Sequence, residues 1–313
     1  MNTTETKTDE TTGYAARLQV GTAIRGLVKV KLAVKGWSGE VSSSTMAREF
    51  EASKGAADHT AWVSLSYLPP LISRELARAR GALRDEFYKN TAPFEDGGWR
   101  VVTAAGYQGL CDAIAPLAAA YRAVGDRIAA SRGSLFGESA QRLGGVFNES
   151  AFPTAERLAA AYTVRLTESA VVVDARIEGL SAELNADISC RMNDRVEEQV
   201  KTAMVDVTER LRDMVCTVLG KIDSLTEGKR VVLAPFIASA RAGLDGIRRA
   251  NLLQDTELDK AITDTSCLLA KLEVGTTALR ENGAATTDIA AKATGIKADI
   301  AKLFNAFSTE ELA

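Results

Sequence analysis

One stretch of this 313-residue chain constrains its fold more than any other, because it contains no proline and no glycine between Gly179 and Gly220. Over about residues 173–219, apolar side chains recur every three or four positions, mostly every four, at Leu180, Leu184, Ile188, Met192, Val196, Val200, Met204, Val207, Leu211, Val215 and Leu219. This spacing is that of one face of an α-helix. The sequence therefore predicts a single unbroken helix of about 45 residues, about 65 Å long at 1.5 Å per residue.

The rest of the C-terminal part has the same helical character. Apolar stripes predict three further helices, at about 231–251, 255–280 and 287–307. A spacing of four is longer than that of a strict heptad, so bundle packing or a weak supercoil is expected rather than a long zipper. Pairs with the acid four residues before the base predict a solvated outer face for the long helix, at Asp187–Arg191, Glu197–Lys201 and Asp206–Arg210. Residues 173–313 are therefore expected to form a long-helix bundle or stalk.

The N-terminal part mixes helix and strand patterns. Alternation of apolar with polar or basic residues has the period of a half-buried strand, and it predicts strands at 28–34, 99–103 and 162–167. Helical patterns lie around and between them, at about 45–57, 71–87, 107–130 and 153–161. A lone strand is not stable, so we expect these strands to pair in a small antiparallel sheet of two or three strands.

These patterns together predict the fold class and its organisation. We expect a mainly α protein, an elongated helical bundle or coiled-coil stalk with a small two- or three-stranded antiparallel sheet (α+β). Residues 1–14 are polar and have no apolar anchor, so they are expected to be a disordered tail. Residues 15–172 are expected to form the mixed helix and small-sheet region, and residues 173–313 the bundle or stalk.

Composition excludes several classes of protein. The net charge of −3 gives no overall attraction to nucleic acid or to an anionic membrane. No segment approaches the roughly 20 consecutive apolar residues of a membrane-spanning helix, so no membrane partner is expected. The beginning of the chain, MNTTETKTDETTGY, lacks the basic and apolar regions of a secretory signal. A cytoplasmic location is therefore expected.

The sequence contains no recognisable catalytic or metal-binding pattern. His59 is the single histidine, and no nucleophile elbow, phosphate loop or dinucleotide-binding glycine pattern is present. The four cysteines, Cys111, Cys190, Cys216 and Cys267, form no Cys-x-x-Cys pair and are expected to be buried and reduced. We therefore expect no catalytic, cofactor-binding or metal-binding residues, no cofactor and no enzymatic activity.

One weak candidate for a binding site lies in the first predicted strand. Its polar face carries Lys29, Lys31 and Lys35, and Trp37 follows directly. Lysines in a row suit a phosphate backbone, and an indole ring stacks on a base, so this pattern indicates nucleic-acid contact. The alternative is an edge strand whose lysines protect it from aggregation.

Short motifs give the chain a resemblance to a known family. They are a Trp-Ser-Gly turn at Trp37–Gly39, a Gly-Trp-Arg segment at Gly98–Arg100, an aromatic-Pro-Thr helix start at Phe152–Thr154 and a helix start at Leu253–Leu258. With these, residues 20–275 resemble the bacterial and phage family called domain of unknown function 3150. The resemblance implies an accessory component encoded near MoxR-type AAA+ ATPases and von Willebrand factor A-type proteins, and it assigns no functional residue.

These observations lead to two functional expectations. The first is a non-enzymatic interaction or scaffold protein, an accessory partner of such an AAA+ ATPase and von Willebrand factor A-type system in a bacterium or phage. Docking through the helical stalk is expected, with self-association left open. The alternative is a nucleic-acid-binding protein that uses the lysine-rich strand Lys29–Lys35.

Overall fold

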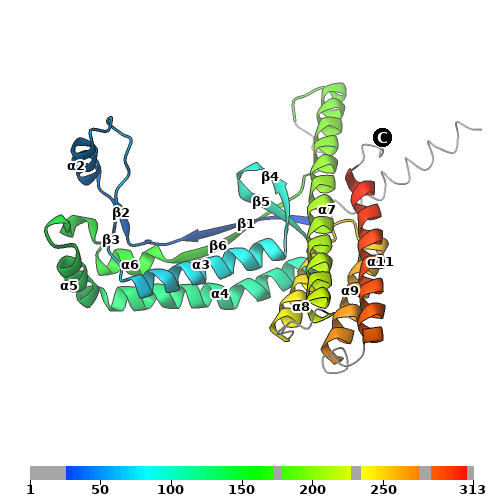
Figure 1. Ribbon diagram of the computed structural model, residues 1–313. Helices are drawn as coiled ribbons and strands as arrows, with labels where there is room; N and C mark the ends of the chain where they lie inside the picture. Colours follow the sequence, from blue (N-terminus) through cyan, green and yellow to red (C-terminus); the bar gives the residue numbers. More distant parts are fainter. Residues whose placement is uncertain (1–25, 173–177, 227–233, 275–282, 309–313) are drawn as a thin grey trace, which may run out of the picture. The chain divides into compact units, whose positions relative to one another are not determined.

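The computed structural model describes residues 26–172, 178–226, 234–274 and 283–308 (Figure 1). Helices predominate, accompanied by a small antiparallel sheet, which confirms the expected mainly α fold class. The tail expected at residues 1–14 lies outside the described residues.

The contacts within the chain divide it into two compact units, each assembled from separate segments. The first contains the described parts of 1–31, 88–110 and 168–313, and the second contains 32–87 and 111–167. The sequence predicted instead a contiguous boundary at residue 172. The difference arises because two early segments, 27–31 and 88–110, group with the C-terminal helices, which spacing along the chain does not indicate.

The main sheet has four strands in the order β4-β5-β1-β6: β1 (Leu27–Lys35), β4 (Ala92–Glu95), β5 (Trp99–Thr103) and β6 (Thr163–Ala170). β1 runs antiparallel to β5, with Val28 opposite Val102 and Val30 opposite Arg100. β5 also pairs with β4 across the short connection Asp96–Gly98, in which Gly97 and Gly98 have φ values of 77° and 82°. The three strands expected from the sequence are all present.

Two expectations about this sheet need correction. It has four strands rather than two or three, and the additional strand is β4. The sequence did not predict β4 because it is only four residues long and contains Pro93, and proline is unusual in a strand interior. In addition, β1 lies between β5 and β6, so it is not an edge strand protected by lysines. A second sheet, of β2 (Glu40–Ser42) and β3 (Ser64–Ser66), was not expected at all.

The long helix is present as α7 (Ala182–Thr226), 45 residues in length. It begins after Gly179, whose φ of 87° suits a glycine, and continues through Gly220, around which there is open space. It packs with α8 (Ala234–Arg249), α9 (Thr256–Val274) and α11 (Gly283–Ser308) in a helical bundle. The Oδ1 atom of Asp255 accepts a hydrogen bond of 2.8 Å from the Leu258 amide and so caps the start of α9.

The core of the first unit lies where the apolar faces of these helices and of the sheet meet. From Val196 to Val215 the predicted stripe of α7 is buried, Leu219 is half-buried, and the partners of this stripe come from all three other helices. Fully or almost fully buried members include Val200, Met204, Val207, Leu211, Val215, Ile237, Leu244, Leu258, Ile262, Leu269, Ile289 and Ile300.

One predicted surface position of α7 has a structural role instead. Arg210 does form the expected ion pair with Asp206, and Arg191 pairs with Asp187 at 2.9 Å. The Arg210 guanidinium, however, also donates to the carbonyl oxygens of Tyr88 and Thr91, at 2.8 and 3.0 Å. Its side chain is only 25% exposed, so this part of the outer face is not solvated as expected.

The second unit packs α3 (Pro70–Lys89, except its last two residues), most of α4 (Ala104–Ala130), α5 (Arg132–Leu143) and α6 (Ala155–Ala161). Tyr162, directly after α6, is buried and packs against Gly125 of α4 so closely that a Cβ atom there would lie 2.5 Å from the Tyr162 Cβ. The Tyr162 ring meets Tyr121 edge-on at 6.0 Å. Glycine at position 125 is therefore what permits this close approach.

Candidate interaction surfaces

The lysines at the start of β1 are engaged within the first unit. The Lys29 Nζ lies 3.1 Å from the Glu95 Oε1, and the Lys29 side chain is 17% exposed. The Nζ atoms of Lys29 and Lys31 lie 5.5 and 5.9 Å from the centroid of the Trp99 ring. A carboxylate and an indole face therefore already compensate much of the positive charge that was expected to meet phosphate.

Lys35 and Trp37 belong to the second unit. Lys35 is exposed, and its carbonyl oxygen accepts from the Tyr121 hydroxyl at 3.0 Å. The Trp37 ring is half-buried and packs edge-on against Phe152, with 5.1 Å between ring centroids. Its carbonyl oxygen accepts from the Tyr162 hydroxyl at 2.9 Å. Of the four residues expected to contact nucleic acid, Lys35 alone is exposed.

The segment Glu40–Ser66, here called the tip, contains the helix predicted at about 45–57 together with a two-stranded ribbon that the sequence did not predict. It consists of β2, helix α2 (Ser44–Lys54), a returning loop and β3, with α2 at the end of the two-stranded ribbon (Figure 1). The Ser43 side chain caps α2 by accepting from the Met46 amide. Gly55 ends it in the left-handed conformation, with φ 65°. Local capping thus defines both ends of α2.

The carboxylate of Glu51 ties the returning loop of the tip to α2. Its Oε1 accepts a hydrogen bond of 2.8 Å from the amide of Ala61, and the residue is only 3% exposed. Hydrogen bonds from the backbone of Ala61, and then of His59 and Thr60, hold the pKa of this carboxyl below its usual value. His59 itself is exposed and has a φ of 64°. The Glu51 carboxylate therefore holds the conformation of the returning loop.

Large aromatic side chains flank this bond and face solvent. Trp62, next to Ala61, is 82% exposed, and Phe50, next to Glu51, is 51% exposed. An indole as exposed as this is unusual, because tryptophan is highly buried on average. The Glu51–Ala61 hydrogen bond thus joins the two backbone segments that carry the exposed aromatic residues. A Trp in the polar stretch DHTAWVS was the only sequence signal for this surface.

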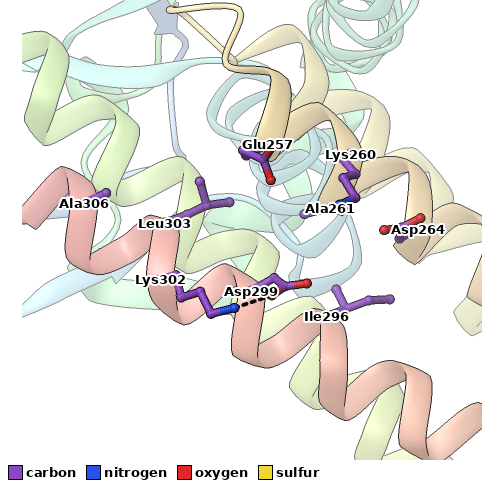
Figure 2. A pocket seen from close by; sticks show the side chains of 9 residues that line it. All are labelled: Glu257, Lys260, Ala261, Asp264, Ile296, Asp299, Lys302, Leu303 and Ala306. Atoms are coloured by element: carbon purple, nitrogen blue, oxygen red, sulfur yellow. Dashed lines mark hydrogen bonds and ion pairs between the residues drawn. The ribbon is translucent and has the colours of Figure 1, made fainter.

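A groove runs between α9 and α11 in the first unit, with a volume of about 330 Å³ (Figure 2). Its walls carry Glu257, Lys260 and Asp264 from α9, and Asp299 and Lys302 from α11. The Lys302 Nζ bonds to Asp299 on its own helix, at 3.0 Å. Because acidic and basic side chains alternate on both walls, the groove concentrates neither sign of charge.

The described residues also bear on membranes, metals and cysteines. Among them no helix is long and apolar enough to cross a membrane, and no group of three or more histidine, cysteine, aspartate or glutamate residues is arranged to hold a metal ion. All four cysteines are free. Cys190 and Cys267 are exposed and Cys111 and Cys216 are half-buried, which corrects the expectation that all four are buried.

Comparisons of the chain with models of protein families, with curated proteins and with solved structures found no match. The resemblance to domain of unknown function 3150 therefore stays a prediction, and so do the partners that it implies.

Proposed function

We propose that this protein is a non-enzymatic interaction protein that docks on a protein partner through the tip. The exposure of Trp62 is the observation that carries the proposal. Following the family resemblance, the proposed partner is a MoxR-type AAA+ ATPase that works with a von Willebrand factor A-type protein. The docking element proposed here is the tip, whereas the sequence analysis expected docking through the helical stalk.

The chemistry of the tip suits docking on a protein. Tryptophan is among the residue types most enriched at binding hot spots, where a large apolar ring fills a pocket of the partner. A second exposed aromatic residue, Phe50, adds apolar area within the tip. Because capping and the Glu51 hydrogen bond already order the loop, little conformational entropy is lost on binding.

The first test is binding of the purified full chain to a MoxR-type ATPase from the native host, measured by isothermal titration calorimetry. Trp62→Ala is expected to weaken binding by about 30-fold or more, which corresponds to about 2 kcal/mol for a hot-spot residue. Leu71→Ala is the matched control, because Leu71 is 78% exposed but lies on α3, outside the tip. Equal effects of the two substitutions, or no binding by the unaltered chain, would overturn the proposal.

A second experiment distinguishes docking on the ATPase from the alternative, nucleic-acid binding by the strand Lys29–Lys35. Co-purification of the ATPase with the chain is expected to survive nuclease treatment and to show little dependence on salt. Recovery that disappears with nuclease, and binding to oligonucleotides that falls steeply with salt concentration and with Lys35→Gln, would favour the alternative instead.

A further inference from the structure

Two arginine side chains of the first unit meet just after the end of α3. Arg100, on β5, donates from its Nε to the Thr91 hydroxyl and from its Nη2 to the Thr91 carbonyl oxygen, each at 2.7 Å. The Nη1 of Arg210, on α7, donates to the same carbonyl oxygen at 3.0 Å. One acceptor therefore holds two positively charged guanidinium groups close together. We call Arg100 and Arg210 the arginine pair.

The arginine pair carries more positive charge than its surroundings compensate. Arg100 is half-buried, and the side chain of Arg210 is 25% exposed. Among the residues that the structure describes, Asp206 is the one carboxylate in an ion pair with either arginine. Burial, and after it the charge of Arg210, lowers the pKa of Arg100 to about 10. Two positive charges and one negative charge leave a net +1, which water screens less here than on an open surface.

Both members of the arginine pair have donors to spare. A guanidinium group has five N–H donors. In the described part of the chain, the hydrogen bonds of Arg100 come from Nε and Nη2, and those of Arg210 come from Nη1 and Nη2. The Nη1 of Arg100 and the Nε of Arg210 are thus still available. Guanidinium donors match the oxygens of an anion, so the pair has both the charge and the donors to bind one more.

An exposed aromatic ring lies beside the arginine pair. Tyr88 is 51% exposed, and the guanidinium carbon of Arg100 lies 4.9 Å from the centroid of its ring. The Tyr88 carbonyl oxygen accepts from Arg210 at 2.8 Å, which fixes the backbone of Tyr88 against the pair. Tyrosine and arginine are both enriched at the hot spots of protein interfaces. This surface therefore combines an anion-binding group with an apolar one.

From these contacts we propose that the arginine pair binds a carboxylate of a protein partner, on an acidic side chain whose apolar neighbour packs on the Tyr88 ring. A single carboxylate cancels the net +1, whereas a polyanion would also place negative charge beside Asp206. Nucleic acid fits less well for this reason, and because the net charge of −3 gives the chain no overall attraction to it. The surface belongs to the first unit and the tip to the second, so this proposal does not rest on docking through the tip.

The test is NMR of the full chain, in which each arginine gives its own Nε–H signal. An acetylated Glu-Leu-Glu-Leu peptide should shift the signals of Arg100 and Arg210. It should not shift that of Arg241, an exposed arginine already paired with Glu273. The matched peptide Gln-Leu-Gln-Leu should leave all three signals in place. Arg100→Lys keeps the charge but loses the planar fork, so peptide binding measured at Arg210 should weaken about fivefold or more.

Substitution of Asp206 tests the charge balance in the opposite direction. Asp206→Asn removes the competing carboxylate, so the acidic peptide should bind about threefold more tightly or better. Glu209→Gln is the matched control, because it removes one negative charge from the same helix at a carboxylate that pairs with Arg212 instead. It should change binding much less. Partial unfolding cannot imitate this result, since it weakens binding rather than tightening it.

Two results with the peptides would overturn the proposal: no shift of the arginine pair by the acidic peptide, or an equal shift by the glutamine peptide. Equal effects of Asp206→Asn and Glu209→Gln would also overturn it. A decathymidine oligonucleotide that shifts the same signals at lower concentration than the acidic peptide would replace the protein partner by nucleic acid. Trp62→Ala should leave peptide binding unchanged, so a failure here is distinguishable from a failure of docking through the tip.

Discussion

Replacement of Gly125 by alanine tests the close packing of the second unit. In an open helix this change stabilises, because glycine has the lower helix propensity by about 1 kcal/mol. Here the new methyl group would lie 2.5 Å from the Tyr162 Cβ, well inside the 3.5–4.0 Å or so at which carbon atoms attract one another. Tyr162 is buried, so it has little freedom to move away.

The net effect is worked out from these opposing terms. Overpacking of a core costs about 1–3 kcal/mol. Displacement of the Tyr162 ring also weakens its hydrogen bond to the Trp37 carbonyl oxygen, worth about 1 kcal/mol. Set against a gain of about 1 kcal/mol from helix propensity, Gly125→Ala should lower the free energy of unfolding by about 1–3 kcal/mol.

Urea denaturation of the full chain, followed by circular dichroism, measures this change. The matched control is Gly81→Ala in α3, where a new Cβ meets nothing within 4 Å, so stability should rise by up to about 1 kcal/mol. The two substitutions should therefore have opposite signs. If Gly125→Ala stabilises as much as Gly81→Ala, the reasoning from close packing is wrong.

Three further predictions concern hydrogen bonds and pH. Arg210→Met removes two hydrogen bonds to the carbonyls of Tyr88 and Thr91 and should cost about 2 kcal/mol in urea denaturation. Burial raises the pKa of Tyr162, so its contribution to stability is complete below the ordinary tyrosine value of about 10 and is lost as pH rises above it. Stability measured from pH 9 to 11 should therefore fall more steeply for the unaltered chain than for Tyr162→Phe. Glu51→Gln replaces a charged acceptor by a neutral one, so the Ala61 amide should exchange its hydrogen faster at neutral pH, as measured by NMR.

Elements with strong local periodicity were predictable from the sequence. β5 begins and ends at the predicted residues, and the stripe positions Val200, Met204 and Leu211 of α7 are buried as expected. The period of a helix or strand depends on residues near one another in the chain, so local spacing is sufficient to read it. The short strand β4 was not predicted, because a segment of four residues that includes a proline is too short to show the alternation of a strand.

The environment of the candidate site residues was not predictable in the same way. Lys29 meets Glu95 across 66 positions of sequence, and Arg210 meets Thr91 across 119. Such pairs arise only when the strands and α7 pack together. The exposure of Trp62 is likewise a property of the folded tip. From the sequence alone, a tryptophan in a polar loop is equally consistent with a buried side chain that anchors the loop to a core.

The sequence by itself thus determined that this protein is mainly helical, that a long helix lies in its C-terminal half and which face of that helix is apolar. The tertiary structure alone decided which part of the apolar stripe is buried, that β1 is an interior strand and that its first lysine is paired. The physical reason is that periodicity follows from backbone geometry, whereas burial and charge pairing depend on which distant segments come into contact.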